Sequence, residues 1–362
     1  MNKNILIVVP SSNFGGGESY IYNLAKYLKS EGVNVVLFSA CERLNIELNT
    51  LLKDIFYISD CVSLGGNTIK TIFSINRFVS THKVDAVLLN GLPEMGVYSK
   101  FIKSDNIFSI GHSNEFWISE NTKLFSKRFI KSLFIQGYGK SLKGLIGINS
   151  LAIDNMAANV DLKYKTRLIY NGVAPVYISK KVYNPKKIVF GRISRMVEGK
   201  GNDLLLKAFS LIIKEISNVK LVFAGDGPQL EHLRKLANSL GIREYVEFAG
   251  FISAEEFFSK IDCMISPSLM EATPMVILES FSCKVPVLAT KVGGVPDLIE
   301  HLDTGYLFGE NSIEELVNAM RYFVNNAEDF SDITERAYAN YESHFTLDVM
   351  GKNTYDFIFD KA

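Results

Sequence analysis

The chain has 362 residues and a mass of 40.5 kDa, a length that predicts two domains of ordinary size. Hydrophobic residues make up 47% and charged residues 22%, which excludes an intrinsically disordered chain. Lysine plus arginine and aspartate plus glutamate both number 39, and this balance disfavours a general nucleic-acid binder. No stretch approaches the roughly 20 apolar residues of a membrane-spanning helix. The four cysteines form no Cys-x-x-Cys pair, so we expect no disulfide framework, no zinc site and a cytoplasmic setting.

Short β-branched runs alternate with longer amphipathic segments along the whole chain. In the first half we expect a helix over 18–30 and strands at 5–9, 33–39, 84–89, 107–110, 144–148 and 167–170. In the second half we expect strands at 187–190, 220–224, 246–248, 263–265 and 285–288. Continuously apolar strands that alternate with helices indicate parallel sheets covered on both faces. The predicted fold class is therefore α/β, with one Rossmann-like sheet in each half.

A stretch with little periodicity separates the two series. Residues 173–186 include two prolines and are predicted to be a linker. The predicted domains are then residues 1–172 and residues 187–344, with a C-terminal helix over about 345–362 that packs on the first domain. Open parallel sheets bind ligands at the carboxyl ends of their strands, so we expect a central cleft that both sheets face.

Two candidate ligand contacts fall in the first domain. Gly16 and Gly17 follow the first strand and open the first helix, where backbone can approach an anion. The dinucleotide fingerprint is incomplete there, because Tyr20 replaces its last glycine, and a plain strand-to-helix turn is the alternative. His112 follows a predicted strand and can donate to a bound hydroxyl or phosphate; a solvated loop histidine is the alternative.

Basic residues follow the first strand of the second domain. Arg192 comes directly after a strand-end glycine, and Arg195 and Lys200 follow on a glycine-containing loop before a helix. An arginine fork and a lysine point charge suit a diphosphate. The alternative is a charged face that is merely solvated.

Two glutamates eight positions apart form the strongest local pattern. Glu271 precedes a helix for which Thr273 is the expected N-cap and Pro274 the first helical residue. Glu279 then lies inside a largely apolar helix, where a carboxylate needs donors such as the vicinal hydroxyls of a ribose. We expect Glu271 to reach a sugar hydroxyl and the backbone N–H groups over 274–276 to receive an anionic oxygen. A structural, ion-paired glutamate is the alternative.

Three catalytic motifs are absent from the sequence. It contains no Asp-x-Asp metal-carboxylate motif, no phosphate-binding loop of the Gly-x4-Gly-Lys-Ser/Thr type and no Gly-x-Ser-x-Gly nucleophile turn. The usual manganese site for a nucleotide-sugar is therefore not expected.

Short motifs run through the chain in a recognisable order. In the second half they are Gly191-Arg192 with Lys200-Gly201, Ala224-Gly225-Asp226-Gly227-Pro228, Phe248-Ala249-Gly250-Phe251, Ser266-Pro267-Ser268, the Glu-x7-Glu pair Glu271 and Glu279, Val292-Gly293-Gly294-Val295-Pro296 and Thr304-Gly305-Tyr306-Leu307. Weaker signatures in the first half are Gly15-Gly16-Gly17-Glu18, His112 and Ile169-Tyr170-Asn171-Gly172-Val173. From residue 189 to about 308 the chain resembles the donor-binding domain of retaining family 4 glycosyltransferases, which have the GT-B fold.

The resemblance implies an enzyme that transfers a sugar from a nucleotide-sugar donor, such as a UDP-sugar, with retention at the anomeric carbon. It implies no metal and no cofactor. The acceptor would be a saccharide or a lipid-linked saccharide in cell-surface polysaccharide or glycoconjugate synthesis, in the cytoplasm or peripherally at the inner membrane face. Because no second carboxylate is clearly suited to act as a nucleophile, we expect same-face attack assisted by the departing phosphate.

The resemblance also assigns roles to residues. Arg192 and Lys200 would hold the diphosphate, Glu279 the ribose and Glu271 the donor sugar. The remaining contacts to sugar and phosphate would come from Thr273, Pro274, Met275, Val276, His112, Gly16 and Gly17, and the expected catalytic residues are His112, Glu271, Arg192 and Lys200. The family spacing from arginine to lysine fits Arg195 better than Arg192, so either can meet the diphosphate; we favour Arg192 because it directly follows the strand-end glycine.

Other functions fit similar sheets. A sugar-nucleotide epimerase of GT-B shape would share the donor site but transfer nothing, and a non-catalytic binding protein would turn nothing over. An NAD-dependent oxidoreductase would need a complete glycine fingerprint and an acid closing the second strand, and Tyr20 and the late Glu42 argue against it.

Residues 116–143 combine many basic residues with aromatic and aliphatic ones and a single acid, Glu120. On a helix, Lys123, Lys127 and Lys131 lie opposite Phe125, Phe129 and Leu133. This pattern is typical of an interfacial helix on anionic lipid, which makes an anionic membrane surface a candidate partner. The alternative is a helix that packs its apolar side on the first sheet.

Overall fold

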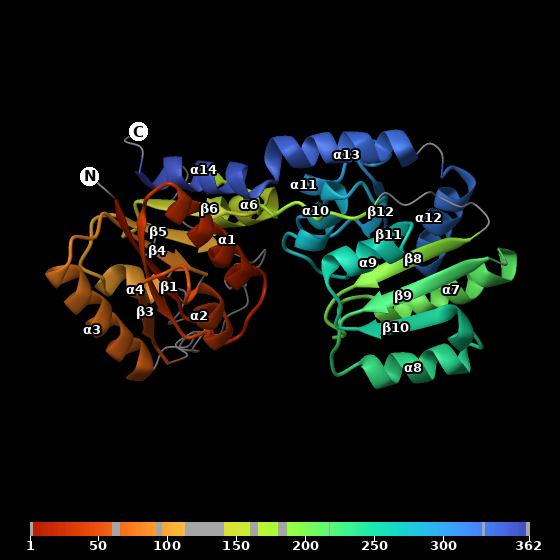
Figure 1. The fold of residues 1–362 in the computed structure, drawn as a ribbon, viewed down its shortest axis with the longest axis horizontal. Helices are drawn as coiled ribbons and strands as arrows, with labels where there is room; N and C mark the ends of the chain where they lie inside the picture. Colours follow the sequence, from red (N-terminus) through yellow and green to blue (C-terminus); the bar gives the residue numbers. More distant parts are fainter. Residues whose placement is uncertain are drawn as a thin grey trace. The chain divides into compact units, whose positions relative to one another are not determined.

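The computed structural model describes residues 3–59, 66–91, 96–112, 141–159, 166–179, 187–216, 218–327 and 330–359. The chain divides into two compact units, a first unit of residues 1–172 with 347–362 and a second unit of residues 173–346. Each contains one parallel sheet with helices packed around it (Figure 1). Most of the predicted basic helix and residues 180–186 of the predicted linker lie outside the described residues.

The first unit contains a seven-stranded sheet in the order β3-β2-β1-β4-β5-β6-β7. Its strands are β1 (Asn4–Val9), β2 (Asn34–Ser39), β3 (Asp54–Tyr57), β4 (Ala86–Asn90), β5 (Ile107–Gly111), β6 (Gly144–Gly147) and β7 (Thr166–Leu168). Its described helices are α1 (Gly16–Ser30), α2 (Glu42–Leu48), α3 (Gly66–Thr81), α4 (Gly96–Phe101), α6 (Ser150–Asn159) and α14 (Leu347–Phe359).

The second unit contains a six-stranded sheet in the order β10-β9-β8-β11-β12-β13. Its strands are β8 (Ile188–Ile193), β9 (Val219–Ala224), β10 (Val246–Gly250), β11 (Cys263–Ser266), β12 (Val287–Thr290) and β13 (Tyr306–Phe308). Its described helices are α7 (Asn202–Glu215), α8 (Leu230–Ser239), the short 3-10 helix η1 (Arg243–Tyr245), α9 (Ala254–Lys260), α10 (Met275–Ser282), α11 (Val295–Leu298), α12 (Ile313–Asn325) and α13 (Phe330–His344).

The central strands are buried on both faces, which explains their unbroken apolar runs. In β1, Ile7 pairs with Leu37 of β2 and with Leu88 of β4, and in β8, Phe190 lies between Leu221 and Cys263. Every residue of β4 and of β11 is buried. The predicted α/β class with two parallel Rossmann-like sheets is confirmed.

Two edge strands were not expected from the sequence. β3 shows three exposed residues out of four, and β13 is only three residues long. An edge strand that is not covered on both faces lacks the continuous apolar run by which the central strands were found.

The C-terminal helix α14 packs against α1 at the other end of the sequence (Figure 1). The hydroxyl groups of Tyr20 and Thr354 lie 3.0 Å apart in the buried interface. Gly351 faces Tyr27 so closely that an added Cβ would lie 2.1 Å from its Cγ. The two helices therefore fit together only because Gly351 has no side chain.

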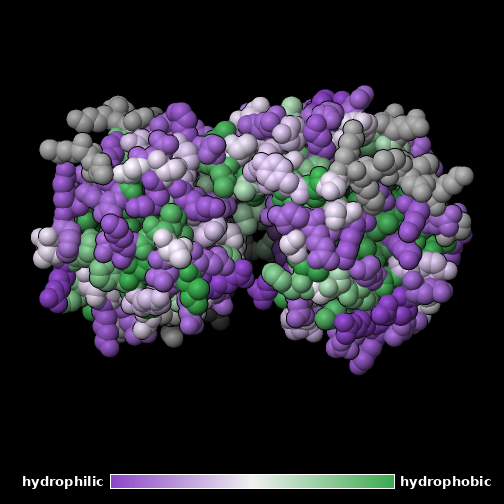
Figure 2. Space-filling view, in the orientation of Figure 1, coloured by the Kyte–Doolittle hydropathy of each residue, from purple (hydrophilic) through white to green (hydrophobic). Residues whose placement is uncertain are grey.

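Apolar side chains are gathered mainly inside the two units. The face drawn in Figure 2 carries hydrophilic side chains over much of both units, with hydrophobic ones scattered between them. Within the described ranges, no helix combines the length and the apolar character needed to cross a bilayer.

Gly351→Ala is expected to lower the unfolding temperature. Glycine to alanine inside a helix normally stabilises by roughly 1 kcal/mol, but forcing a methyl group against Tyr27 should cost about 1–3 kcal/mol more than that gain. Thermal unfolding followed by circular dichroism measures the change. Gly16→Ala is the matched control, because no atom lies within 4 Å of a Cβ placed there. A Gly351→Ala variant more stable than the parent would contradict the described α1–α14 packing.

Candidate functional site

Three neighbouring strands of the second sheet end next to one another. β8, β11 and β12 are adjacent and parallel, so the loops that follow them share the carboxyl edge of the sheet. The loop after β8 carries Arg195 and Lys200, and the loop after β11 carries Glu271. The sheet therefore brings together residues that are far apart in the sequence.

Arg192, in β8, is the most deeply buried charged residue at this edge, with 1% of its surface exposed. Its Nη1 donates to Ser266 Oγ at 3.0 Å, and its Nη2 donates to Ser268 Oγ at 2.9 Å and to the Lys200 carbonyl at 3.2 Å. Its Nε has no hydrogen-bond partner among the residues that the structure describes. Burial lowers the pKa of Arg192 to about 10, which still leaves it charged at neutral pH.

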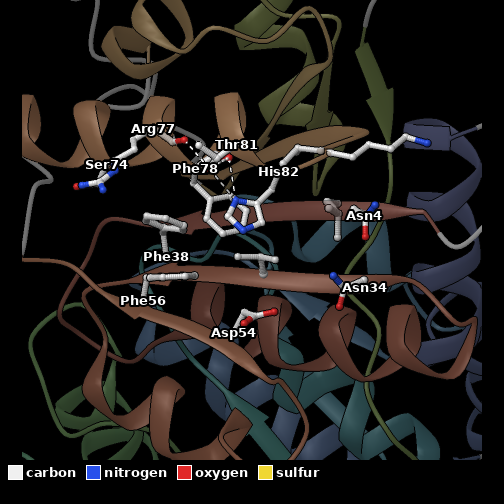
Figure 3. Close-up of a pocket in the computed structure, with 14 residues that line it drawn as sticks. Asn4, Asn34, Phe38, Asp54, Phe56, Ser74, Arg77, Phe78, Thr81 and His82 are labelled. Atoms are coloured by element: carbon white, nitrogen blue, oxygen red, sulfur yellow. Dashed lines mark hydrogen bonds between the residues drawn. The ribbon is translucent and has the colours of Figure 1, made fainter.

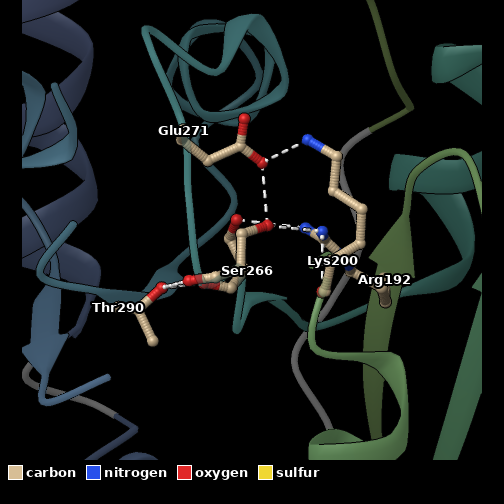
Figure 4. A network of polar contacts seen from close by, with 6 residues as sticks. Arg192, Lys200, Ser266, Glu271 and Thr290 are labelled. Carbon is tan, nitrogen blue, oxygen red and sulfur yellow. Dashed lines mark hydrogen bonds and ion pairs between the residues drawn. The ribbon is translucent and has the colours of Figure 1, made fainter. Parts of the chain in front are cut away.

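Lys200 and Glu271 form an ion pair beside this guanidinium. The Lys200 Nζ lies 2.8 Å from Glu271 Oε1, and Ser268 Oγ donates to the same oxygen at 2.7 Å. Since Arg192 donates to Ser268, one chain of polar contacts connects both cations to the carboxylate (Figure 4). The Lys200 and Glu271 side chains are 28% and 13% exposed. An ammonium has three N–H groups, so Lys200 can bind an anionic ligand without leaving Glu271.

Glycine is required where the two loops meet. Gly201 has a φ of +68°, and an added Cβ would lie 1.8 Å from the Pro267 carbonyl oxygen. The Leu269 N–H donates to the Gly199 carbonyl at 2.8 Å, and Thr290 of β12 donates to the Ser266 carbonyl at 3.2 Å. The backbone at this edge is thus braced from three strands.

The start of α10 differs from the sequence expectation. Pro274 is the N-cap rather than the first helical residue, and Thr273 precedes the cap. Pro274 has an extended ψ of 107°, and its carbonyl accepts the Ile277 N–H at 3.1 Å. Because proline has no N–H, only Met275 and Val276 can offer backbone donors from the predicted segment.

Glu279 is a half-buried carboxylate one turn into α10. Within the described part of the chain no hydrogen bond or ion pair reaches its carboxylate. Burial, with a smaller effect from the nearby Glu255, raises the pKa of Glu279 to about 7. A carboxylate in this setting gains most from a ligand that brings hydroxyl donors.

The two candidate arginines differ sharply in exposure. Arg192 points into the protein interior with both terminal nitrogens engaged, which does not match the expectation of a guanidinium open to a diphosphate. Arg195 lies exposed on the loop after β8. In this structure Arg195 and Lys200 present the accessible positive charge, and Arg192 holds the loops that carry them.

His112 and the two glycines lie in the first unit. His112 Nε2 lies 2.7 Å from Asn90 Oδ1, and burial lowers the pKa of His112 to about 4, so the ring is neutral at physiological pH. With Nε2 donating to Asn90, Nδ1 is left as an acceptor rather than the expected donor. An added Cβ at Gly17 would lie 3.1 Å from His112 Cδ2, while one at Gly16 would meet no atom within 4 Å.

The first turn of α1 is capped by its own glutamate. The Gly15 N–H donates to Glu18 Oε2 at 2.9 Å, and burial raises the pKa of Glu18. A carboxylate at this helix start competes with any bound anion, which weakens the case for phosphate binding there.

Sequence reasoning gave no role to three residues that organise these sites. Ser266 and Ser268 carry the hydrogen bonds of Arg192, and Asn90 fixes the orientation of His112. Each is a polar residue at or just past the end of an apolar strand, and that was the signal available in the sequence. Among the described residues, no group of three or more histidine, cysteine or acidic side chains is arranged to hold a metal ion.

Comparison with known proteins gives a family match for one part of the chain. The second unit matches glycosyl transferases group 1. The matched residues are 175–340. The GDP-mannose-dependent alpha-(1-6)-phosphatidylinositol monomannoside mannosyltransferase of Mycobacterium tuberculosis is 32% identical over 138 residues, which cover 35% of this chain. This chain spans only 36% of the length of that curated relative.

Solved structures match over both units. A glycosyltransferase from Rickettsia africae has a TM-score of 0.81 and 20% identity, and the match covers 100% of both chains. HepE from Anabaena, solved with UDP and glucose, has a TM-score of 0.79 and 18% identity, and the match covers 98% of this chain and 99% of HepE. The chain thus has the GT-B fold, built from two Rossmann-like halves.

The raised pKa of Glu279 predicts a pH-dependent stability. The pKa of Glu279 in the folded protein, about 7, lies above its ordinary value of 4.5. The contribution of Glu279 to the free energy of unfolding is therefore full below about pH 4.5 and is lost as the pH rises through 7. Glu279→Gln should therefore gain stability relative to the parent between about pH 5 and pH 8, by an amount on the order of 1–3 kcal/mol. Denaturant unfolding at several pH values measures this, with the exposed Glu244→Gln as control. A stability difference that stays constant with pH would contradict the shifted pKa.

Proposed function

We propose that the chain is a retaining glycosyltransferase that moves a sugar from a nucleotide-sugar donor to a saccharide or lipid-linked saccharide. The observation that carries the proposal is the Arg192–Ser268–Glu271–Lys200 network, which lies within the segment that matches glycosyl transferases group 1. The names of the relatives, a GDP-mannose-dependent enzyme and a HepE complex with UDP and glucose, support a nucleotide-sugar as donor. We assign the reaction to cell-surface polysaccharide or glycoconjugate synthesis, in the cytoplasm or peripherally at the inner membrane face.

The donor diphosphate is bound by charge and by backbone dipoles. Lys200 and Arg195 supply cations, and the N–H groups of Met275 and Val276 at the start of α10 receive phosphate oxygens. Glu279 accepts hydrogen bonds from the ribose hydroxyls. Glu271, held by Lys200 and Ser268, accepts from a hydroxyl of the donor sugar.

Arg192 acts as a positioning residue in this proposal. Its buried guanidinium fixes Ser266, Ser268 and the Lys200 backbone before a ligand arrives. Donors that are already in place cost no reorganisation when negative charge develops on the leaving group. The network therefore favours departure of a nucleoside diphosphate.

The reaction proceeds on one face of the donor sugar. The bond from the anomeric carbon to the diphosphate oxygen breaks, the acceptor oxygen bonds to the same carbon, and the acceptor proton passes to the departing phosphate. No protein carboxylate is used as a nucleophile, in contrast to retaining glycosidases. Neutral His112 accepts a hydrogen bond from a sugar hydroxyl through Nδ1, next to Gly17.

The rival functions are separated by the fate of the donor. An epimerase would interconvert the nucleotide-sugar without an acceptor, an oxidoreductase would reduce NAD, and a binding protein would leave the donor unchanged. A labelled donor panel, read for label on an acceptor, for an epimerised nucleotide-sugar and for reduced NAD, distinguishes all four functions. Label that never leaves the nucleotide in any donor–acceptor pair would count against transfer.

Glu279→Gln should weaken nucleoside diphosphate binding at least tenfold. A hydrogen bond to a charged acceptor contributes roughly 1.5–3 kcal/mol, and the amide offers only one acceptor oxygen in place of two. Isothermal titration calorimetry with UDP and GDP measures the affinities, and Glu244→Gln is again the control. The parent should also bind the 2′-deoxy nucleotide more weakly than the ribonucleotide. Equal affinity for both would rule out ribose recognition by Glu279.

Activity should survive exhaustive EDTA treatment. The sequence lacks the Asp-x-Asp motif, and in this proposal Arg195 and Lys200 neutralise the diphosphate in place of a divalent cation. Initial rates before and after chelation, and after adding back manganese or magnesium, provide the measurement. Activity that disappears with EDTA and returns only with a divalent metal would contradict a metal-free donor site.

A further inference from the structure

Three neighbouring strands of the first sheet begin with a polar residue on a face that is otherwise apolar. These residues are Asn4 of β1, Asn34 of β2 and Asp54 of β3. By the strand register and the alternation of side chains, the same face continues with Leu6, Val8, Val36, Phe38 and Phe56. Parallel strands begin at one edge, so the three polar side chains lie at the amino edge of the sheet, away from the carboxyl edge at which such sheets bind ligands.

The three polar side chains line a hollow of about 540 Å³ between these strands and α3 (Figure 3). The residues of α3 that line it recur at helical spacing and so form one stripe of the helix: Ser74, Arg77, Phe78 and Thr81. Small-molecule sites usually measure roughly 300–1,000 Å³. The hollow is therefore large enough to hold a ligand of its own.

The polar side chains of the hollow are not engaged by the protein. Asn4 and Asn34 bond to their neighbours through backbone groups only. Across the described ranges, no hydrogen-bond or ion-pair partner meets their side-chain amides or the charged groups of Asp54 and Arg77. Amides, a carboxylate and a guanidinium together supply both donors and acceptors, and all of them are available to a ligand.

Aromatic rings form the apolar wall of the hollow. Phe38 and Phe56 stack with their ring centroids 4.7 Å apart, and His82 stacks on Phe78 with centroids 4.1 Å apart and an interplanar angle of 6°. Phe56 is 39% exposed and His82 is exposed as well, so flat ring surface borders the hollow. We call the hollow the amino-edge site and define it by Asn4, Asn34, Asp54, Phe56, Arg77 and His82.

The charges around the amino-edge site are balanced. Asp54 and Arg77 have opposite signs, and Lys83, which also lines the hollow, forms an ion pair with Asp85 at 3.7 Å. A phosphorylated ligand would meet the carboxylate of Asp54, and an organic cation would meet the guanidinium of Arg77. A neutral ligand that donates and accepts hydrogen bonds meets neither repulsion.

We infer that the amino-edge site binds a neutral di- or trisaccharide. One face of a sugar ring carries C–H groups that pack on aromatic rings, while its hydroxyl groups both donate and accept hydrogen bonds. Amide, carboxylate and guanidinium groups are planar, so each can bond to two adjacent hydroxyls. The inference deepens the proposed function, on which the choice of a saccharide rests, and gives the chain a second contact with its acceptor outside the donor-binding unit.

Ligand-observed NMR with the full chain tests the inference. The probes are di- and trisaccharides of glucose, galactose, mannose and N-acetylglucosamine, and no nucleotide is present. Free phenylalanine, a zwitterion with a flat ring, is the comparison ligand. We expect saturation transfer from the protein to a saccharide of this panel and none to phenylalanine. No transfer to any saccharide, or transfer to phenylalanine as strong as to the best saccharide, would overturn the inference.

Two variants locate the binding site. Asn34→Ala with Asp54→Ala removes hydrogen-bonding groups and should weaken saccharide affinity roughly tenfold or more. His82→Ala removes an exposed ring and should weaken it roughly threefold. The control, Asn238→Ala with Asp332→Ala, makes the same replacements at exposed residues of the second unit and should bind as the parent does. Circular dichroism checks that each variant is folded.

The binding test and the transfer assay can fail separately, because the binding test needs no donor. Saccharide binding that survives unchanged in the variant lacking Asn34 and Asp54 side chains would belong to another surface and would reject the amino-edge site, even in a chain that transfers sugar. Binding that is lost in this variant and kept in the control would support the site, even if no donor panel gave transfer.

Discussion

A guanidinium removed from water must find acceptors within the protein, since an uncompensated buried charge costs several kcal/mol. Arg192 meets this demand with the hydroxyl groups of Ser266 and Ser268 and with the Lys200 carbonyl, which come from two neighbouring strand ends. Glu271 balances the charge and in turn holds Lys200. The loops after β8 and β11 are therefore fixed to each other by the buried guanidinium of Arg192.

In the proposed function, this arrangement separates the residues that hold the loops in place from those that contact the donor. Gly201 lets the two loops approach within contact distance. Ser268 accepts a hydrogen bond from Arg192 and donates one to the carboxylate of Glu271, so it connects the two groups. Glu279 differs, because its carboxylate has no hydrogen-bond or ion-pair partner in the described ranges and its burial raises its pKa to about 7. In the proposed function, the free-energy cost of burying this carboxylate is offset when ribose hydroxyls donate to it.

Composition and periodicity predicted the central strands, because strands such as β1 and β11 are buried on both faces and must be apolar throughout. The same reasoning missed β3, which is exposed at a sheet edge. It also misplaced the start of α10: Thr273 is a good N-cap by propensity, but Pro274 takes the extended cap conformation instead. The burial of Arg192 could not be predicted, since it depends on acceptors more than 70 positions away, and a sequence shows that a residue is basic without showing what surrounds it.

The packing of α14 on α1 has a consequence for biosynthesis. The first unit is discontinuous, because its last helix follows the whole second unit in the chain. During translation the surface of α1 that includes Tyr20 and Tyr27 remains uncovered while residues 173–346 are made, for roughly 10–35 s at ribosomal rates of about 5–20 residues per second. The first unit closes only after α14 has been made, and α14 follows the last residue of the second unit in the chain. The half that is synthesised first is thus the half that finishes folding last.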